Sequence, residues 1–112
     1  MASRVLIAAS VKPLVLSILA DGEAYGYQII QRIQRLSDGA ITWSASTLYP
    51  VLHRLEAQKL IRSEWRKADT GRERKYYRLT PKGARVLAKE RTQWLEVHGV
   101  LAQLWQLDVH PE

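Results

Sequence analysis

Residues 46–56, with the sequence STLYPVLHRLE, combine an apolar stripe with side chains that can bind another molecule. The apolar stripe has the i, i+3, i+4, i+7 spacing of one helical face and consists of Leu48, Val51, Leu52 and Leu55. The other side carries hydroxyl, imidazole and guanidinium groups, on Ser46, Thr47, Tyr49, His53 and Arg54. Such groups bond phosphates and base edges, and an arginine can bond guanine through two donors. The pattern predicts a helix that packs with one face and binds with the other.

A strongly basic segment follows, between Lys59 and Arg85. It holds ten basic and three acidic side chains, so its net charge of +7 exceeds the +6 of the whole chain. Clustered positive charge attracts polyanions such as nucleic acid. On charge alone, a well-solvated hairpin surface is an equally good interpretation. A helix followed by a basic hairpin is, however, the order of parts in a winged helix, in which the helix enters a DNA groove.

Composition limits the classes of protein to consider. The chain has 112 residues, enough for one domain or one domain with an arm. It contains no cysteine, which excludes disulfides, thiolate catalysis and cysteine-ligated zinc. The apolar run at residues 5–10 is followed by Lys12 and Pro13, so it is too short for a signal sequence or a membrane span. We expect a soluble, cytoplasmic protein without metal or other cofactor.

The elements around the binding helix are predicted from apolar runs and breakers. Residues 12–20 predict a buried helix with Pro13 in its first turn. Residues 25–37 predict a second helix, whose inward face comprises Ile29, Ile30, Ile33 and Leu36. Residues 40–43 are rich in strand formers and suggest a short first strand. Ser44 and Ser46 are both good N-caps for the binding helix, and Pro50 favours the later start.

The basic segment alternates in the manner of a hairpin. Residues 61–67 predict one strand, with Ile61, Ser63 and Trp65 on one face, and residues 75–79 predict the return strand, with Tyr77 and Leu79 inward. Thr80 and Pro81 then begin a helix that extends to near Leu107. Its apolar seam has 3-4-3 spacing and comprises Trp94, Val97, Leu101 and Leu104. We expect this seam to be buried against a second subunit.

Three blocks of the sequence together resemble the PadR family of bacterial transcriptional regulators. They are GEAYGYQI at residues 22–29, STLYPVLHRLE at 46–56 and RKYYRLTPKG at 74–83, followed by a helix that carries Trp94. The resemblance covers most of the chain, about residues 12–94, and a single helix after the hairpin is similar to the short members of the family.

The resemblance implies a mostly helical α+β fold, with a winged helix-turn-helix domain over residues 1–80 and a dimerisation helix over residues 81–112. It also implies a homodimer that binds double-stranded DNA, usually as a repressor, and releases it when a small molecule binds. In the family the matching turn faces the DNA backbone, which implies the same position for Tyr27. We expect the hairpin, or wing, to contact the backbone or minor groove through Arg72, Arg74 and Lys75. Tyr27 as a core residue, and Tyr49 as a residue that only shapes the helix start, stay open as alternatives.

The resemblance also places an aromatic ligand site on the dimerisation helix. Four residues share one face there at i, i+4, i+7 and i+11, namely Trp94, His98, Leu101 and Trp105. A flat, apolar or cationic effector can stack in such a pocket, and a plain dimer core is the alternative.

Three functions of different classes remain to be compared. A sequence-specific DNA-binding regulator explains both the polar helix face and the basic wing. A winged-helix protein-interaction module without specific DNA binding explains the wing but not the polar helix face. An enzyme is disfavoured, because no catalytic motif occurs and the spacing of Ser44, His53 and Asp69 supports no triad.

Overall fold

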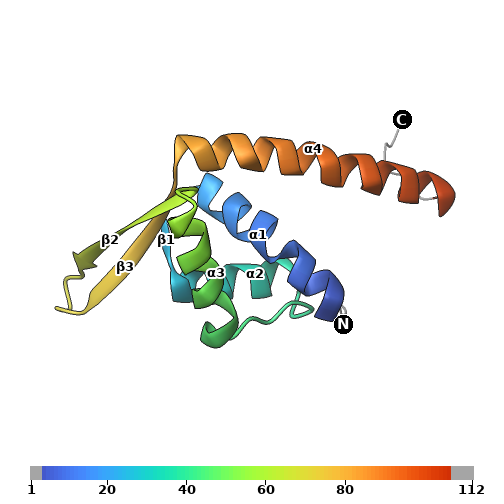
Figure 1. Cartoon of the computed structure of the whole chain (residues 1–112). Coiled ribbons are helices and arrows are strands. Elements are labelled where there is room, and N and C mark those ends of the chain that lie inside the picture. Colours follow the sequence, from blue (N-terminus) through green and yellow to red (C-terminus); the bar gives the residue numbers. More distant parts are fainter. Residues whose placement is uncertain (1–3, 107–112) are drawn as a thin grey trace.

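The computed structural model describes residues 4–106 as four helices and a small three-stranded sheet. The elements in chain order are α1 (Arg4–Ala20), β1 (Ala24–Tyr25), α2 (Gly26–Leu36), α3 (Ala45–Ala57), β2 (Ile61–Lys67), β3 (Glu73–Leu79) and α4 (Pro81–Leu104). Helices α1, α2 and α3 pack together, the β2–β3 hairpin projects from them, and α4 runs back along α1 (Figure 1). This is the predicted mostly helical α+β architecture.

One apolar core joins the first three helices to the base of the sheet. Its fully buried side chains include Leu16 of α1, Ile29 of α2, Leu48 and Leu52 of α3, and Tyr77 of β3. The apolar stripe predicted for residues 46–56 is therefore confirmed, with Val51 partly buried at its edge. Burying this stripe fixes which side of α3 is left for binding.

Two prolines lie deeper inside helices than the first-turn positions predicted for them. α1 begins at Arg4 instead of residue 12, so Pro13 lies in its interior. α3 begins at Ala45 with Ser44 as N-cap, so Pro50 is also internal, and the preference for the Ser46 start was wrong. Each proline forgoes one backbone hydrogen bond. The nearby buried side chains, Val15 in α1 and Leu48 in α3, hold the helices together despite that loss.

The first strand also lies elsewhere than predicted. β1 consists of Ala24 and Tyr25, which pair with Tyr77 and Tyr76 of β3. Residues 40–43 form no strand, and the amide of Ile41 instead donates to the Ser37 hydroxyl at 2.9 Å. Leu36, predicted to be inward, is exposed at the end of α2, where that helix leaves the core.

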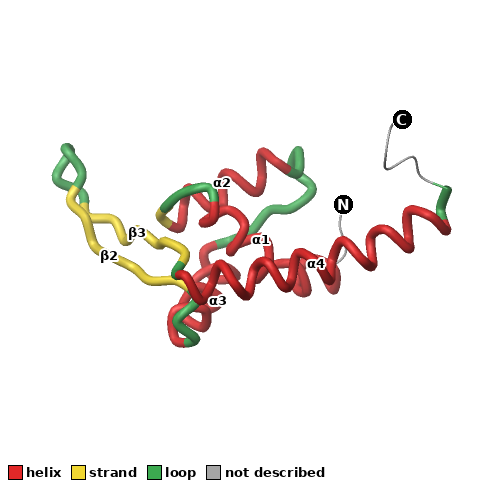
Figure 2. Tube along the Cα trace, turned by 90° about the horizontal axis from the view of Figure 1, so that it is seen from above, coloured by secondary structure: helices red, strands yellow, loops and turns green. Residues whose placement is uncertain are grey.

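The β2–β3 hairpin extends beyond the apolar core. β2 has the predicted bounds and pairs with β3 from Ile61–Leu79 at the base to Lys67–Glu73 near the tip. β3 begins at Glu73 instead of residue 75. The tip reaches well away from the helices (Figure 2). Trp65, predicted to share the inward face with Ile61, is therefore 63% exposed.

Helix α4 starts at a well-bonded junction and ends beyond the core. The Thr80 hydroxyl accepts from the Gly83 amide at 3.0 Å and lies 2.7 Å from the Lys59 carbonyl oxygen, to which it donates. α4 ends at Leu104, and Leu107 lies outside the described residues. In the described part of the chain, no helix is both long and apolar enough to cross a membrane.

Candidate nucleic-acid interface

The exposed side of α3 begins with a cluster of hydroxyl groups. The Ser44 side chain caps the helix by accepting from the Thr47 amide at 3.3 Å. Its oxygen lies 2.8 Å from the Ser46 hydroxyl and 3.2 Å from the Thr47 hydroxyl. All three residues are exposed. A helix N-terminus with exposed hydroxyls suits phosphate oxygens, because the amides of the first turn and the helix dipole both favour anions.

Tyr49 has a packing partner as well as an exposed surface. A Cβ atom on Gly26 would lie only 2.3 Å from the Tyr49 hydroxyl oxygen, so the ring rests against the backbone at the start of α2. Only glycine allows this approach. Tyr49 therefore joins α3 to α2, while its exposed edge remains available to a ligand.

The three wing residues predicted to bind DNA differ in the contacts that their side chains already make within the chain. Arg72 lies in the turn of the hairpin and is exposed. Arg74 donates to the Tyr25 hydroxyl at 2.8 Å and its guanidinium stacks 4.4 Å from the centre of the Tyr25 ring. Lys75 lies 3.9 Å from the Glu56 carboxylate and 6.0 Å from the centre of the Trp65 ring. Arg72 is thus the freest of the three for a phosphate.

An open cleft of about 770 Å³ collects most of the predicted DNA-binding residues. It lies between the start of α2, the exposed side of α3 and the wing. The predicted residues that line it are Tyr27, Tyr49, His53, Arg72, Arg74 and Lys75. Tyr27 is 60% exposed, so its core alternative is not supported. Ser46 and Thr47 lie at the first turn of α3, and Arg54 lies near its other end; these three do not line the cleft.

Besides Tyr77, which was predicted to be inward, two more aromatic residues line this cleft without having been predicted there. Trp65 and Tyr25 both line it, from β2 and from the residue that precedes α2. The signal for Trp65 was present, because a tryptophan among charged residues near a hairpin tip has little core to enter. Tyr25 carried no such signal, since its place depends on the pairing of β1 with β3.

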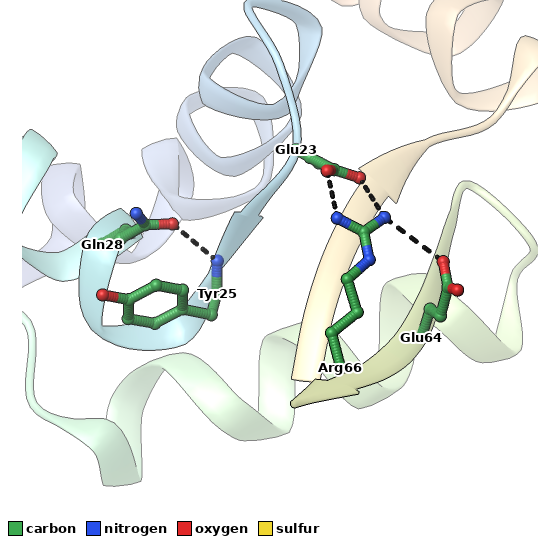
Figure 3. A network of polar contacts seen from close by, with 5 residues as sticks. All are labelled: Glu23, Tyr25, Gln28, Glu64 and Arg66. Atoms are coloured by element: carbon green, nitrogen blue, oxygen red, sulfur yellow. Dashed lines mark hydrogen bonds and ion pairs between the residues drawn. The ribbon is translucent and has the colours of Figure 1, made fainter. Parts of the chain in front are cut away.

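The face of the sheet that carries Glu64 and Arg66 holds a network of ion pairs (Figure 3). Arg66 donates two hydrogen bonds to the Glu23 carboxylate, one with an Nη2–Oε2 distance of 2.7 Å, and a third to Glu64 at 3.2 Å. The hydrogen bond from Arg66 lowers the pKa of Glu23 below its usual value, and Glu23 in turn raises the pKa of Arg66. Each group thus favours the charged form of the other.

Burial also perturbs Tyr77, at the floor of the cleft. Its loss of solvent raises its pKa to about 12 from an ordinary value of 10.0, with the nearby Tyr49 and Glu56 adding to the shift. The neutral phenol is thus the form that fits the fold.

This shift predicts a loss of stability in alkali. The pKa of Tyr77 is higher in the folded than in the unfolded chain. Its contribution to the free energy of unfolding is therefore complete below pH 10 and is lost as the pH rises through about 12. Urea unfolding at a series of alkaline pH values is expected to show this decline, and Tyr77→Phe is expected to flatten it. Tyr27→Phe, at an exposed tyrosine, is the control; an equal flattening there would contradict the assignment.

The residues predicted for an effector site lie on the outer half of α4. Trp94 is 43% exposed and Trp105 is 64% exposed, His98 is also exposed and Leu101 is partly buried. Trp105 is the C-cap instead of a helical residue. A shallow hollow of about 330 Å³ on α4 is lined by Glu96, Val97, Val100 and Leu101, so it includes only one of the four. Among residues 4–106, no cluster of His, Asp or Glu side chains could hold a metal ion.

Comparison with known proteins gives consistent matches. Residues 15–89 match the family described as "Transcriptional regulator PadR-like family". The chain is 42% identical over 83 residues to Transcriptional regulator Rv3488 of Mycobacterium tuberculosis, covering 74% of each chain. A transcriptional regulator from Clostridium thermocellum has a similar structure, with a TM-score of 0.82, 30% identity and coverage of 92% of this chain and 97% of that one. The structure of a PadR family transcriptional regulator from Eggerthella lenta is also similar, with a TM-score of 0.73 and 39% identity. The match covers 89% of this chain and 85% of that one.

Proposed function

The chain belongs to the PadR-like family of transcriptional regulators, and from that premise we propose that it is a repressor that binds a pseudo-palindromic operator as a homodimer. The observation that carries the proposal is the cleft between α2, α3 and the wing, where cationic and aromatic side chains surround the exposed side of α3. A basic groove beside a polar helix face is suited to a DNA duplex.

In this proposal, residues 1–80 form the DNA-binding domain. α3 lies in the major groove, with Ser46, Thr47, Tyr49, His53 and Arg54 towards phosphates and base edges. Tyr27 and the wing residues Arg72, Arg74 and Lys75 contact the backbone on either side. Phosphate contacts fix the position of the protein, and base contacts select the sequence.

Residues 81–112 form the dimerisation helix in the same proposal, although residues 107–112 lie outside the described part. The support is a set of exposed apolar side chains on one region of α4, which comprises Trp94, Leu95, Val97, Val100, Leu104 and Trp105. Exposed apolar area of this extent on a helix normally marks an interface. Two-fold symmetry then places the two half-sites about one turn of DNA apart.

A small, flat aromatic or apolar effector that releases the repressor is the last part of the proposal. Two tryptophans with exposed rings, Trp94 and Trp105, support it, because such rings stack well on flat ligands. His98 and Leu101 would complete the pocket between two subunits.

The test is fluorescence anisotropy with the intergenic DNA upstream of the chain's own gene. A shuffled duplex of equal composition is the competitor, and both are measured at two salt concentrations. Preference for the native duplex that persists at high salt is expected. Equal, salt-labile binding to both duplexes would contradict specific regulation and favour a protein-interaction module.

Arg72→Ala is expected to weaken binding to the native and shuffled duplexes by the same factor, roughly tenfold at low salt, because it removes a sequence-independent phosphate contact. The slope of log affinity against log salt should fall by about one. Arg35→Ala removes the same charge from the last turn of α2 and should leave the slope unchanged. A loss confined to the native duplex would instead make Arg72 a base-reading residue.

A further inference from the structure

The wing is joined to the helices by little backbone pairing. Within residues 4–106, β1 is the only strand between the wing and α2; it contributes two residues, and both pair with the inner part of β3. In the part of the chain that the structure describes, the outer half of the hairpin, from Trp65–Lys75 to Lys67–Glu73, has no third strand beside it. A two-stranded hairpin of this kind is flexible by itself. Something other than sheet pairing must set its direction relative to α3.

Side chains on the face of the sheet that carries Arg66 supply such a connection. Arg66 of β2 bonds to both oxygens of Glu23, which precedes β1, and to Glu64 two residues back in its own strand (Figure 3). We call these three residues the clasp. The bidentate geometry matters, because two parallel hydrogen bonds fix direction as well as distance. The clasp therefore links the wing to the segment that leads into α2.

The clasp continues inward through aromatic contacts. The Arg66 guanidinium lies 4.8 Å from the centre of the Tyr76 ring, which packs edge to face on Tyr25 with 5.4 Å between ring centres. The amide of Tyr25 donates to the Gln28 side chain at 3.1 Å in the first turn of α2 (Figure 3). Gly26, which follows Tyr25, is the residue on which Tyr49 of α3 rests. A continuous series of contacts therefore leads from the wing to the proposed DNA-reading helix.

From these contacts we propose that the clasp is a specificity device: Glu23 positions the wing against α3, and it also keeps Arg66 from binding phosphates. The inference rests on the proposed function. Glu23 is a positioning residue and touches no DNA. With the clasp closed, α3 and the wing meet the duplex at one angle, so that base and backbone contacts form together only on the operator. With it open, the wing adapts to any duplex and Arg66 adds an unspecific phosphate contact.

The test compares Glu23→Gln with Asp69→Asn. Both changes remove one negative charge, but Asp69 lies in the wing turn and is exposed, outside the clasp. Two readouts are measured for each variant and for the unaltered chain: the ratio of shuffled-duplex to native-duplex dissociation constants, and amide hydrogen exchange of β2 and β3. A thermal melt of each variant verifies that the fold is retained.

Glu23→Gln is expected to tighten binding to the shuffled duplex and to reduce the ratio about fivefold, the factor that corresponds to a bidentate surface ion pair. Exchange in the wing should become faster. Asp69→Asn should tighten binding to both duplexes equally, with the ratio and the exchange unchanged. The double variant Glu23→Arg with Arg66→Glu swaps the two charges and keeps the net charge. It is expected to recover most of the ratio of shuffled-duplex to native-duplex dissociation constants.

Two results would overturn the clasp as a specificity device. Unchanged wing exchange in Glu23→Gln would mean that the ion pair does not hold the wing. Faster exchange with an unchanged ratio would mean that the direction of the wing does not affect specificity. If the unaltered chain itself prefers no duplex, the proposed function fails, whereas the exchange measurement still decides whether the clasp exists.

Discussion

Replacing Gly83 with alanine is expected to lower the free energy of unfolding by about 2–4 kcal/mol, because the added methyl group has no space. A Cβ atom there would lie 2.0 Å from the Leu60 carbonyl oxygen and 2.8 Å from Cδ1 of Leu79. The carbonyl group cannot easily move, since it accepts from the Thr80 amide and lies 3.0 Å from the Thr80 hydroxyl. The junction that joins β2, β3 and α4 would have to open.

Gly99→Ala is the matched control for this prediction. Gly99 also lies within α4, but nothing is within 4 Å of its added Cβ atom. Alanine there should raise stability by about 0.5–1 kcal/mol through helix propensity alone. Urea unfolding followed by far-UV circular dichroism measures both variants. A Gly83→Ala variant as stable as the unaltered chain would contradict the close packing at the start of α4.

Val97→Glu is expected to abolish dimerisation and to weaken operator binding at least about a hundredfold. The glutamate would place a charge within the exposed apolar region of α4, and burying it unpaired in an interface costs several kcal/mol. In the proposed dimer each subunit contacts one half-site, so most of the affinity is expected to be lost with the partner. The expected effect on the fold is small, because Val97 is exposed in the single chain.

Sedimentation equilibrium and anisotropy measure the two effects on the same samples. Gln103→Glu is the control, since it adds the same charge to an exposed residue on the side of α4 opposite Trp94. A Val97→Glu variant that remains dimeric would place the interface elsewhere on the chain. A monomeric variant with unchanged operator affinity would contradict the need for a dimer.

Periodicity in the sequence was sufficient to predict the buried face of an element that packs against a single core. The stripe of Leu48, Leu52 and Leu55 is buried as predicted, because the 3.6-residue repeat fixes one face of a helix whatever lies opposite. The same holds for β2, whose bounds follow from its alternation. The prediction failed for Pro13 and Pro50, since helix ends depend on whether packing outweighs the loss of one backbone hydrogen bond.

The sequence by itself determined the chemistry of the candidate interface and the family to which the chain belongs. The residue types that line the cleft, and the charge of the wing, follow from composition and order alone. Only the tertiary structure decided which of these side chains are free and which are already engaged. Arg66 and Arg72 read alike in the sequence, yet the first is held by Glu23, 43 residues away, while the second is exposed in the wing turn. Contacts between distant residues depend on the pairing of β1 with β3, which no local pattern encodes, and that pairing brings Glu23 beside Arg66 of the wing.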